Sequence, residues 1–237
     1  MITIKQLIRR VLNKFGVEVG HYVRQRYRIM KFHDISLVLD IGANTGQYAE
    51  MLRREGYMGK IYSFEPIKSA FEQLSQKVGA DPLWQCQNVA LGDTDGTAEI
   101  NISKNIVSSS ILPITSLSTT AAPDSGYIAK ETISISRLDS IYPEIVKESE
   151  QVYMKIDVQG FEMQVLKGAL NSLPKVKVVE IEISIAQLYK DQPSLFAILT
   201  HFQSFNFSLA AIDKEWIDYS TGHDLQFNAF FINNRNT

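Results

Sequence analysis

The stretch ISLVLDIGANTGQY, residues 35–48, joins a short apolar run to a turn that contains glycine. The length of the run, its β-branched residues and the following glycine predict a buried strand, and residues 46–55 then show helical spacing. The same order repeats with a strand at 60–64 and a helix at 67–78. Because short apolar strands alternate with helices, the sequence predicts an α/β protein with a doubly wound, mostly parallel sheet.

The rest of the chain continues this alternation with one interruption. Further strands are predicted at 83–87, 97–102, 132–136, 152–156, 176–183, 206–211 and 226–232, and further helices at 161–170 and 193–202. Residues 103–130 are rich in Ser, Thr, Ala and Pro and lack clear periodicity, and so long a connection inside a compact domain is usually functional or mobile. The last two strands predict a closing antiparallel hairpin.

The composition favours a globular protein of a reducing compartment. Of the 237 residues 45% are hydrophobic, and no apolar run reaches the ~18 residues of a membrane-spanning helix. The N-terminus lacks the apolar block and cleavage site of a secretory signal. The single Cys86 excludes an internal disulfide framework and a multi-thiolate metal site. We therefore expect a cytoplasmic protein.

Charge is distributed unevenly along the chain. Residues 1–33 carry eight Lys and Arg residues and one acidic residue, whereas residues 34–237 carry 16 basic and 25 acidic residues. We expect a basic helical N-terminal extension at 1–33 and an α/β domain at 34–237. The apolar residues of the extension recur at helical spacing, so it either packs on the domain or lies on an anionic membrane surface, at the inner face of the membrane. An acidic domain disfavours nucleic acid as a partner.

The first strand ends at a candidate ligand-binding turn, because ligands of open α/β sheets bind beyond the carboxyl ends of the strands. Asp40 lies near the strand end, Gly42 permits a tight turn, and Gly46 lets the next helix pack close to the strand. The helix N-terminus can present backbone N–H groups to a carboxylate. Asn44 occupies the place of the second glycine of a dinucleotide fingerprint, so close approach of a pyrophosphate is not expected.

The second and third strands end in residues suited to a nucleoside. Glu65 follows Asp40 by 25 residues, near the ~20-residue offset at which an acid bonds ribose hydroxyls. Pro66 fixes the start of the next helix. Asn88 could hydrogen-bond to the edge of an adenine, and Val89 could pack against its face. The alternatives are that Glu65 only favours a helix N-terminus and that Asn88 is a turn residue.

Two later strands carry charges within apolar sequence. Lys155 and Asp157 share one face of the strand at 152–156, and burying them is costly unless they pair or form a site. Glu180 and Glu182 likewise fall on one side of the next strand, with Glu182 nearer its end. The alternatives are a structural Lys–Asp pair and a solvent-facing glutamate.

Several catalytic motifs do not occur. The four histidines show no metal-ligand spacing, and neither G-x-S-x-G nor a P-loop is found, which disfavours a serine hydrolase and a P-loop nucleotidase.

Four sequence blocks together resemble the FkbM-type family of methyltransferases. The blocks are DIGANTGQY at 40–48, FEP at 64–66, NVALG at 88–92, and KIDVQGFE at 155–162 followed by VLKGA. The resemblance covers roughly residues 36–232 and implies a class I Rossmann-like fold with S-adenosylmethionine as methyl donor. Characterised relatives are mostly O-methyltransferases of sugar or polyketide hydroxyls. Gln159 departs from the family, in which many relatives carry Glu.

On the hypothesis of a methyl transfer from S-adenosylmethionine, the candidate residues take particular roles. The donor-binding residues are expected to be Asp40, Gly42, Asn44, Thr45, Gly46, Tyr48, Glu65, Pro66, Asn88 and Val89. Asp157, with Glu182 second, is expected to act as the base or to orient the acceptor, and Lys155 to keep Asp157 ionised. No metal ligands are predicted, although assistance by a divalent metal at the two carboxylates stays open.

The sequence thus predicts a methyltransferase that acts on a hydroxyl of a sugar, glycolipid or polyketide-like small molecule. The alternatives are a methyltransferase for protein or RNA and a non-catalytic nucleoside-binding module. We expect a small-molecule or glycan acceptor as partner and peripheral membrane contact through the extension.

Overall fold

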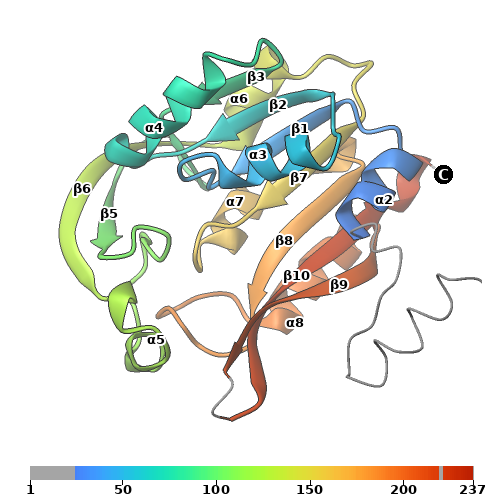
Figure 1. Cartoon of the computed structure of the whole chain (residues 1–237). Coiled ribbons are helices and arrows are strands. Elements are labelled where there is room, and N and C mark those ends of the chain that lie inside the picture. The colour runs from blue at the N-terminus through green and yellow to red at the C-terminus, as the bar shows by residue number, and fades with distance from the viewer. Residues whose placement is uncertain (1–24, 219–220, 237) are drawn as a thin grey trace, which may run out of the picture.

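A seven-stranded sheet forms the centre of the protein (Figure 1), seen in a computed structural model that describes residues 25–218 and 221–236. Its strands run in the order β3-β2-β1-β7-β8-β10-β9. They are β1 (Leu37–Ile41), β2 (Lys60–Phe64), β3 (Trp84–Gln87), β7 (Val152–Ile156), β8 (Val178–Ser184), β9 (Phe207–Asp218) and β10 (His223–Asn233). The first five are parallel, and β10 is antiparallel to both β8 and β9. The predicted doubly wound, mostly parallel sheet is confirmed.

Helices cover both faces of this sheet. One face packs against α2 (Gln25–Phe32), α3 (Gln47–Arg54) and α4 (Lys68–Val78), and the other against α6 (Leu138–Ile145), α7 (Glu162–Lys167) and α8 (Leu195–Ser204). Strand β1 shows why the apolar run is continuous: Leu37, Leu39 and Ile41 pack on one face, while Val38 packs on the other. The helix α6 was not predicted, because Pro143 lies inside it and proline normally interrupts a helical pattern.

A second, three-stranded sheet lies beside the first. It consists of β4 (Ala90–Leu91), β5 (Gly96–Ser103) and β6 (Tyr127–Ser136) in the order β4-β6-β5. Its isoleucines Ile100, Ile133 and Ile135 pack against Ile67 and Ala70 at the start of α4. The segment between β5 and β6 contains α5 (Ser116–Ala121) and the short helix η1 (Pro123–Ser125). The aperiodic segment at 103–130 therefore contains the connection between two strands of this small sheet.

The strand register brings charged residues together at one edge. Asp40 of β1 lies opposite Lys155 of β7, which lies opposite Glu180 of β8. Glu182, two residues further along β8, lies opposite Asn228 of β10. Residues two apart share a face of a strand, so the polar positions of three strands form neighbouring rows on the face covered by α2 and α3.

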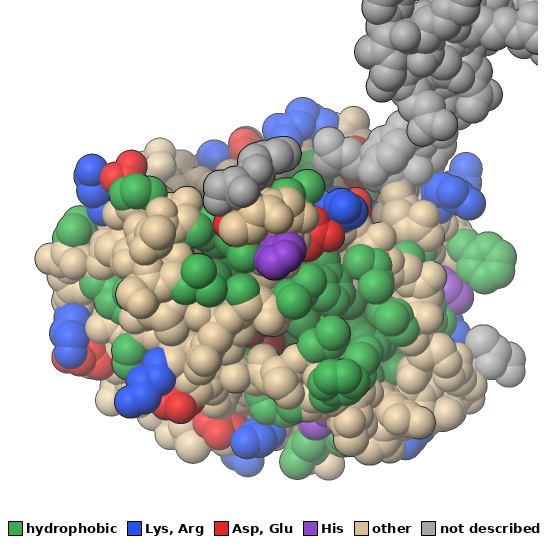
Figure 2. Space-filling view, turned by 90° about the horizontal axis from the view of Figure 1, so that it is seen from below, with side chains coloured by type: hydrophobic (Ala, Val, Ile, Leu, Met, Phe, Trp, Pro, Cys, Tyr) green, Lys and Arg blue, Asp and Glu red, His purple; other side chains and the backbone are tan. Residues whose placement is uncertain are grey.

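Of the predicted basic extension, only residues 25–33 are described, and the amphipathic segment before them lies outside the described residues. Ile29 and Met30 of α2 are buried in the core shared with α3. Among the described helices, none combines the length and apolar character needed to span a bilayer. Seen from below, the described Lys and Arg side chains are scattered among acidic ones (Figure 2). The described residues of this face therefore form no continuous basic stripe.

Candidate functional site

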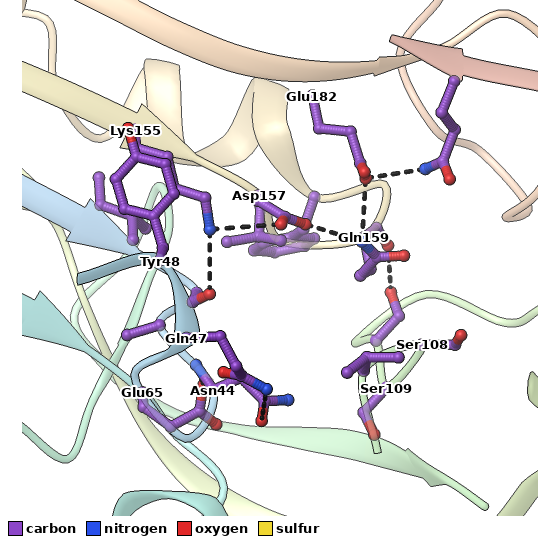
Figure 3. A pocket seen from close by; sticks show the side chains of 18 of the residues that line it. Asn44, Gln47, Tyr48, Glu65, Ser108, Ser109, Lys155, Asp157, Gln159 and Glu182 are labelled. Carbon is purple, nitrogen blue, oxygen red and sulfur yellow. Dashed lines mark hydrogen bonds and ion pairs between the residues drawn. The ribbon is translucent and has the colours of Figure 1, made fainter. Parts of the chain in front are cut away.

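A cavity of about 850 Å³ opens at the carboxyl ends of β1, β2, β7 and β8 (Figure 3). Its size is typical of a site for a small molecule. One part, named the donor half for the role predicted from the sequence, is lined by the turns after β1, β2 and β3. The other, the acceptor half, is lined by the ends of β7 and β8 and by the β9–β10 hairpin, and residues 106–111 line the cavity as well.

Packing requires glycine at two positions of the turn after β1. A Cβ at Gly42 would lie 1.9 Å from the carbonyl oxygen of Asp157, and one at Gly46 would lie 2.7 Å from the ring of Trp84. Both glycines, and Asn44 between them, have positive φ. Gly42, Asn44 and Tyr48 line the cavity, whereas Thr45 and Gly46 do not. The turn therefore lies directly against the end of β7, next to Asp157.

Glu65 is a buried carboxylate at the tip of β2 that lines the cavity. Its two oxygens accept backbone hydrogen bonds from Asn44 N and Ile67 N, both at 2.8 Å. Burial raises the pKa of Glu65 to about 7, while these two hydrogen bonds act in the opposite direction. A carboxylate oxygen can accept two hydrogen bonds, so each one keeps capacity for a ligand hydroxyl. The residue fits a diol.

The predicted adenine site is only partly assembled. Pro66 and Val89 line the cavity with Glu65, but the Asn88 side chain does not. The Asn88 amide instead donates to the carbonyl oxygens of Glu65 at 2.8 Å and of Pro66 at 2.9 Å. Both of its N–H groups are thus engaged with the backbone, which places Asn88 as a turn residue that supports Glu65.

Lys155 links β7 to the turn after β1. Its Nζ lies 3.5 Å from Asp40 Oδ1 and 3.2 Å from Asp157 Oδ2, and it donates to the carbonyl oxygen of Gly42 at 3.3 Å. Burial opposes its charge, but Asp157 and Asp40 together hold the pKa of Lys155 above its ordinary value. Asp40 is fully buried, which raises its pKa, and Lys155 opposes that effect. The predicted Lys155–Asp157 pair is therefore present, with Asp40 as a third member.

Asp157 and Glu182 both lie at the cavity and share one hydrogen-bond donor (Figure 3). Gln159 Nε2 donates to Asp157 Oδ1 at 2.7 Å and to Glu182 Oε2 at 2.9 Å. Glu182 also accepts from Gln226 Nε2 at 2.8 Å, and the Tyr189 hydroxyl donates to Gln159 Oε1 at 2.7 Å. Sequence reasoning noted Gln159 only as a departure from a family. It missed Gln226 and Tyr189, whose spacing relative to the other residues carries no signal.

Tyr48 contributes its ring to the cavity rather than a free hydroxyl. The hydroxyl donates to Glu180 at 2.5 Å, as does that of Tyr153 at 2.6 Å. Arg26 of α2 forms a buried ion pair with the same carboxylate. The Tyr48 ring centroid lies 5.0 Å from the Arg26 guanidinium carbon and 5.2 Å from Lys155 Nζ. Glu180 is thus structural, and Arg26 is a part of the site that its place in the basic extension did not predict.

The hairpin and the segment after β5 complete the lining. Asp213, Glu215 and Trp216 of β9 line the cavity together with Gln226 and Asn228 of β10. Asn228 Nδ2 donates to Glu215 Oε2 at 2.8 Å.

No metal centre is apparent in the described part of the chain. Residues 25–218 and 221–236 contain no group of three or more His, Cys, Asp or Glu side chains arranged to hold a metal ion. Asp157 and Glu182 instead both bind the Gln159 amide.

Comparison with known proteins adds three findings. The family model for the Methyltransferase FkbM domain matches residues 40–209. The 2-O-methyltransferase NoeI of Sinorhizobium fredii (strain NBRC 101917 / NGR234) is 29% identical over 179 residues, which cover 71% of this chain and 72% of that protein. Methyltransferase 1 of Beauveria bassiana (strain ARSEF 2860) is 24% identical over 169 residues, covering 65% of this chain and 68% of that protein.

The crystal structure of a methyltransferase FkbM from Methylobacillus flagellatus KT has the same fold, with a TM-score of 0.56 and 14% identity. The superposition covers 92% of this chain and 49% of that one, so the present chain spans about half of the longer protein. The predicted family and fold class are both confirmed. The chain belongs to the FkbM methyltransferase family and has the class I fold of S-adenosylmethionine-dependent methyltransferases.

Proposed function

We propose that this methyltransferase moves the methyl group of S-adenosylmethionine to a hydroxyl oxygen of an uncharged small molecule or glycan. The observation that carries the proposal is the Glu65 carboxylate, buried at the tip of β2 and bonded to the turn after β1. A carboxylate at this point of a doubly wound fold suits the two hydroxyls of a ribose.

The donor half supplies groups that suit each part of that donor. Gly42 and Asn44, with the Tyr48 ring, would hold the methionine part, and Glu65 the ribose. Pro66 and Val89 offer an apolar surface for the adenine. When bound, the donor supplies a methyl group on a sulfonium that is its own leaving group, so the protein's task is chiefly alignment and exclusion of water.

The acceptor half favours an uncharged partner. Among the described residues that line the cavity, the three Lys and Arg side chains are all engaged by carboxylates. Arg26 pairs with Glu180, Lys155 with Asp40 and Asp157, and Lys214 with Asp224 at 3.4 Å. Among these described lining residues the two buried cations are thus already paired, and Lys214 is the exposed one, about two-thirds accessible. The amides and acids of the hairpin instead suit the hydroxyls of a sugar, glycolipid or polyketide-like molecule.

Oxygen is the acceptor atom that the site suits best. A neutral hydroxyl must lose a proton as it attacks, and a positioned base contributes typically ~10²–10⁴-fold to such a step. Asp157 and Glu182 provide two carboxylates at the cavity, and residues 106–111 form part of its wall. The relative NoeI is named as a 2-O-methyltransferase, in agreement with this assignment.

Calorimetry of donor binding tests the proposal. In Glu65→Ala we expect S-adenosylmethionine to bind at least about 100-fold more weakly, because two charge-assisted hydrogen bonds to ribose are lost. Glu72→Ala, on the exposed side of α4, is the matched control and should bind normally. Unchanged affinity in Glu65→Ala would contradict the ribose assignment.

The acceptor can be found directly. The full chain is incubated with labelled donor and a panel of sugars, glycolipids and nucleotide sugars, and products are analysed for the mass of one added methyl group. We expect methylation among the uncharged members. Methylation restricted to nucleotide sugars would contradict the assignment of an uncharged acceptor.

A further inference from the structure

One amide nitrogen lies between the two carboxylates of the acceptor half (Figure 3). Gln159 Nε2 carries two protons and donates to Asp157 Oδ1 and Glu182 Oε2 at 2.7 and 2.9 Å. The Tyr189 hydroxyl bonds to the amide oxygen at 2.7 Å. Reversing the amide would turn its oxygen toward two carboxylates, so only one orientation satisfies all three partners. Both donor positions of the Gln159 side chain are therefore used by the carboxylates.

The backbone holds this amide in place. Gln159 has φ +53°, a left-handed conformation that non-glycine residues seldom adopt. Its carbonyl oxygen accepts a hydrogen bond from Ser110 Oγ at 2.6 Å, and a Cβ at Gly160 would lie 3.0 Å from Tyr189 Cβ. Such a conformation persists only where the surroundings determine it. Contacts from two other segments thus aim the Gln159 side chain between the acids.

The two carboxylates have different second partners. The other oxygen of Asp157 lies 3.2 Å from the Lys155 ammonium, and a third of its side chain is exposed. Glu182 is buried, and its second donor is the neutral Gln226 amide at 2.8 Å. Within the described residues no cation forms an ion pair with Glu182. Asp157 is therefore engaged by a cation, whereas the hydrogen-bond donors to Glu182 in the described chain are neutral amides.

The groups around Glu182 also favour its taking up a proton. Burial raises its pKa well above the ordinary value, and so do Asp157 of the β7 end, Glu162 of α7 and Glu215 of β9. Lys155 acts in the opposite direction. Tyr189, beyond the Gln159 amide, faces the same carboxylate.

We infer that Gln159 is a positioning residue that gives the two acids different roles: Glu182 accepts the proton of the acceptor hydroxyl, and Asp157 stays an ion-pair partner of Lys155. The inference rests on the proposed function and assigns the base within the same site. The acceptor oxygen forms its bond to the methyl carbon, the sulfur keeps the electron pair of the broken bond, and the hydroxyl proton passes to Glu182 and then to water.

A carbon-13 NMR titration tests the positioning role without donor or acceptor. The full chain is labelled at the side-chain carboxyl of Glu, and the Glu182 signal is assigned from its loss in Glu182→Gln. In Gln159→Leu the midpoint of Glu182 should rise by about one pH unit, because the charged form loses a hydrogen bond. In Gln159→Glu, which keeps the shape but adds a charge, it should rise further.

The control is Gln73→Leu on the exposed side of α4, where the Glu182 midpoint should not move. Thermal unfolding of each variant identifies any that fails to fold, and Gln159→Glu then decides in place of Gln159→Leu. A midpoint that stays within about 0.2 pH units in a folded Gln159 variant overturns the inference.

Kinetics with an acceptor found by the labelling experiment test which acid takes the proton. Glu182→Gln should lower kcat by at least about 100-fold while S-adenosylmethionine affinity stays within about twofold. Asp157→Asn should lower kcat less and retain the rise of rate with pH, and Gln159→Leu should shift that rise to higher pH. The reverse pattern, with Asp157→Asn the more damaging and the pH dependence kept in Glu182→Gln, overturns the inference. A chain that binds no donor would contradict the proposed function instead, and the NMR titration would then decide this inference alone.

Discussion

The donor and acceptor halves of the cavity are built from different kinds of contact. The donor half depends on backbone: Gly42 lets the turn lie against β7, and Glu65 is held by two backbone N–H groups. The acceptor half depends on side chains from distant segments, as in the hydrogen bonds that Glu182 receives from Gln159 and Gln226. The first uses backbone groups placed by the strand–turn–helix units, and the second uses side chains that only tertiary packing brings together, so mutations should affect them differently.

The largest effect should follow from Gly42→Ala, which adds a side chain where the turn after β1 lies against the end of β7. In Gly42→Ala the new Cβ would lie 1.9 Å from the Asp157 carbonyl oxygen, so β1 and β7 cannot both keep their places. We expect a loss of more than about 4 kcal/mol in the free energy of unfolding, measured in urea, because steric strain adds to an unfavourable φ.

Gly222→Ala separates the two causes in that experiment. Gly222 also has a positive φ, of +73°, but a Cβ added there would have no described residue within 4 Å apart from its chain neighbours. It should lose only about 1–2 kcal/mol, the cost of the left-handed conformation alone. Equal losses in the two variants would mean that contact between the halves does not depend on Gly42.

Breaking the buried ion pair of Arg26 and Glu180 in the cavity wall should have the next largest effect. In Arg26→Met the Glu180 carboxylate keeps the hydroxyls of Tyr48 and Tyr153 but loses its cation in a buried setting. We expect a loss of about 3 kcal/mol, because an uncompensated charge remains buried. Thermal or urea unfolding measures it.

The exposed pair of Lys104 and Asp124 is the control for that variant, with both side chains about two-thirds exposed. Lys104→Met should leave the free energy of unfolding essentially unchanged, because water screens an exposed ion pair. A similarly small loss in Arg26→Met would show that the Glu180 cluster does not depend on its cation.

The contrast between backbone contacts and side-chain contacts also explains how much of the site could be predicted from the sequence. The strands and the glycine turn were predictable because each rests on neighbouring residues, as in the run that ends at Ile41 and Gly42. Asn88 follows its strand as a base-reading residue would, yet its amide bonds two carbonyl oxygens, because backbone groups near the turn also need partners. Residue type and position alone do not distinguish these uses.

The acceptor half was much less predictable. Glu182 and Asp157 were identified by their charge within apolar strands, but Gln226 lies 44 residues from Glu182 and meets it only through the pairing of β10 with β8. Tyr189 reaches Gln159 from the loop after β8. Such contacts depend on strand order and loop packing, which one sequence leaves open.

A pH titration should reveal a change of about tenfold in the affinity of the donor half for S-adenosylmethionine. Burial raises the pKa of Glu65 to about 7, and ribose hydroxyls donate best to the ionised form. S-adenosylmethionine affinity should therefore rise about tenfold between pH 6 and 8, as the ionised fraction of a group of this pKa does. Calorimetry at several pH values measures the rise, and an affinity independent of pH would contradict this role of Glu65.

The stability of the ligand-free protein should change in the opposite direction. A carboxyl whose folded pKa lies above its unfolded value binds more protons when folded, so the free energy of unfolding falls as pH rises between about 4.5 and 7. Glu162, whose pKa burial also raises to about 7, contributes in the same sense. Glu65→Gln should reduce this slope and remove the pH dependence of donor binding.

The smallest effect should come from the hairpin, where a side-chain contact can be removed without disturbing the donor half. In Asn228→Leu the Glu215 carboxylate loses its 2.8 Å hydrogen bond, but Glu215 is exposed and can bond to water instead, so stability should change by less than about 1 kcal/mol. S-adenosylmethionine affinity should stay within about twofold, while KM for the acceptor rises a few-fold. Ile212→Ser, on the opposite face of β9, should leave both unchanged. A fall in donor affinity with an unchanged acceptor KM would mean that the hairpin belongs to the donor half, because a contact between hairpin strands can affect the donor only if the donor reaches it.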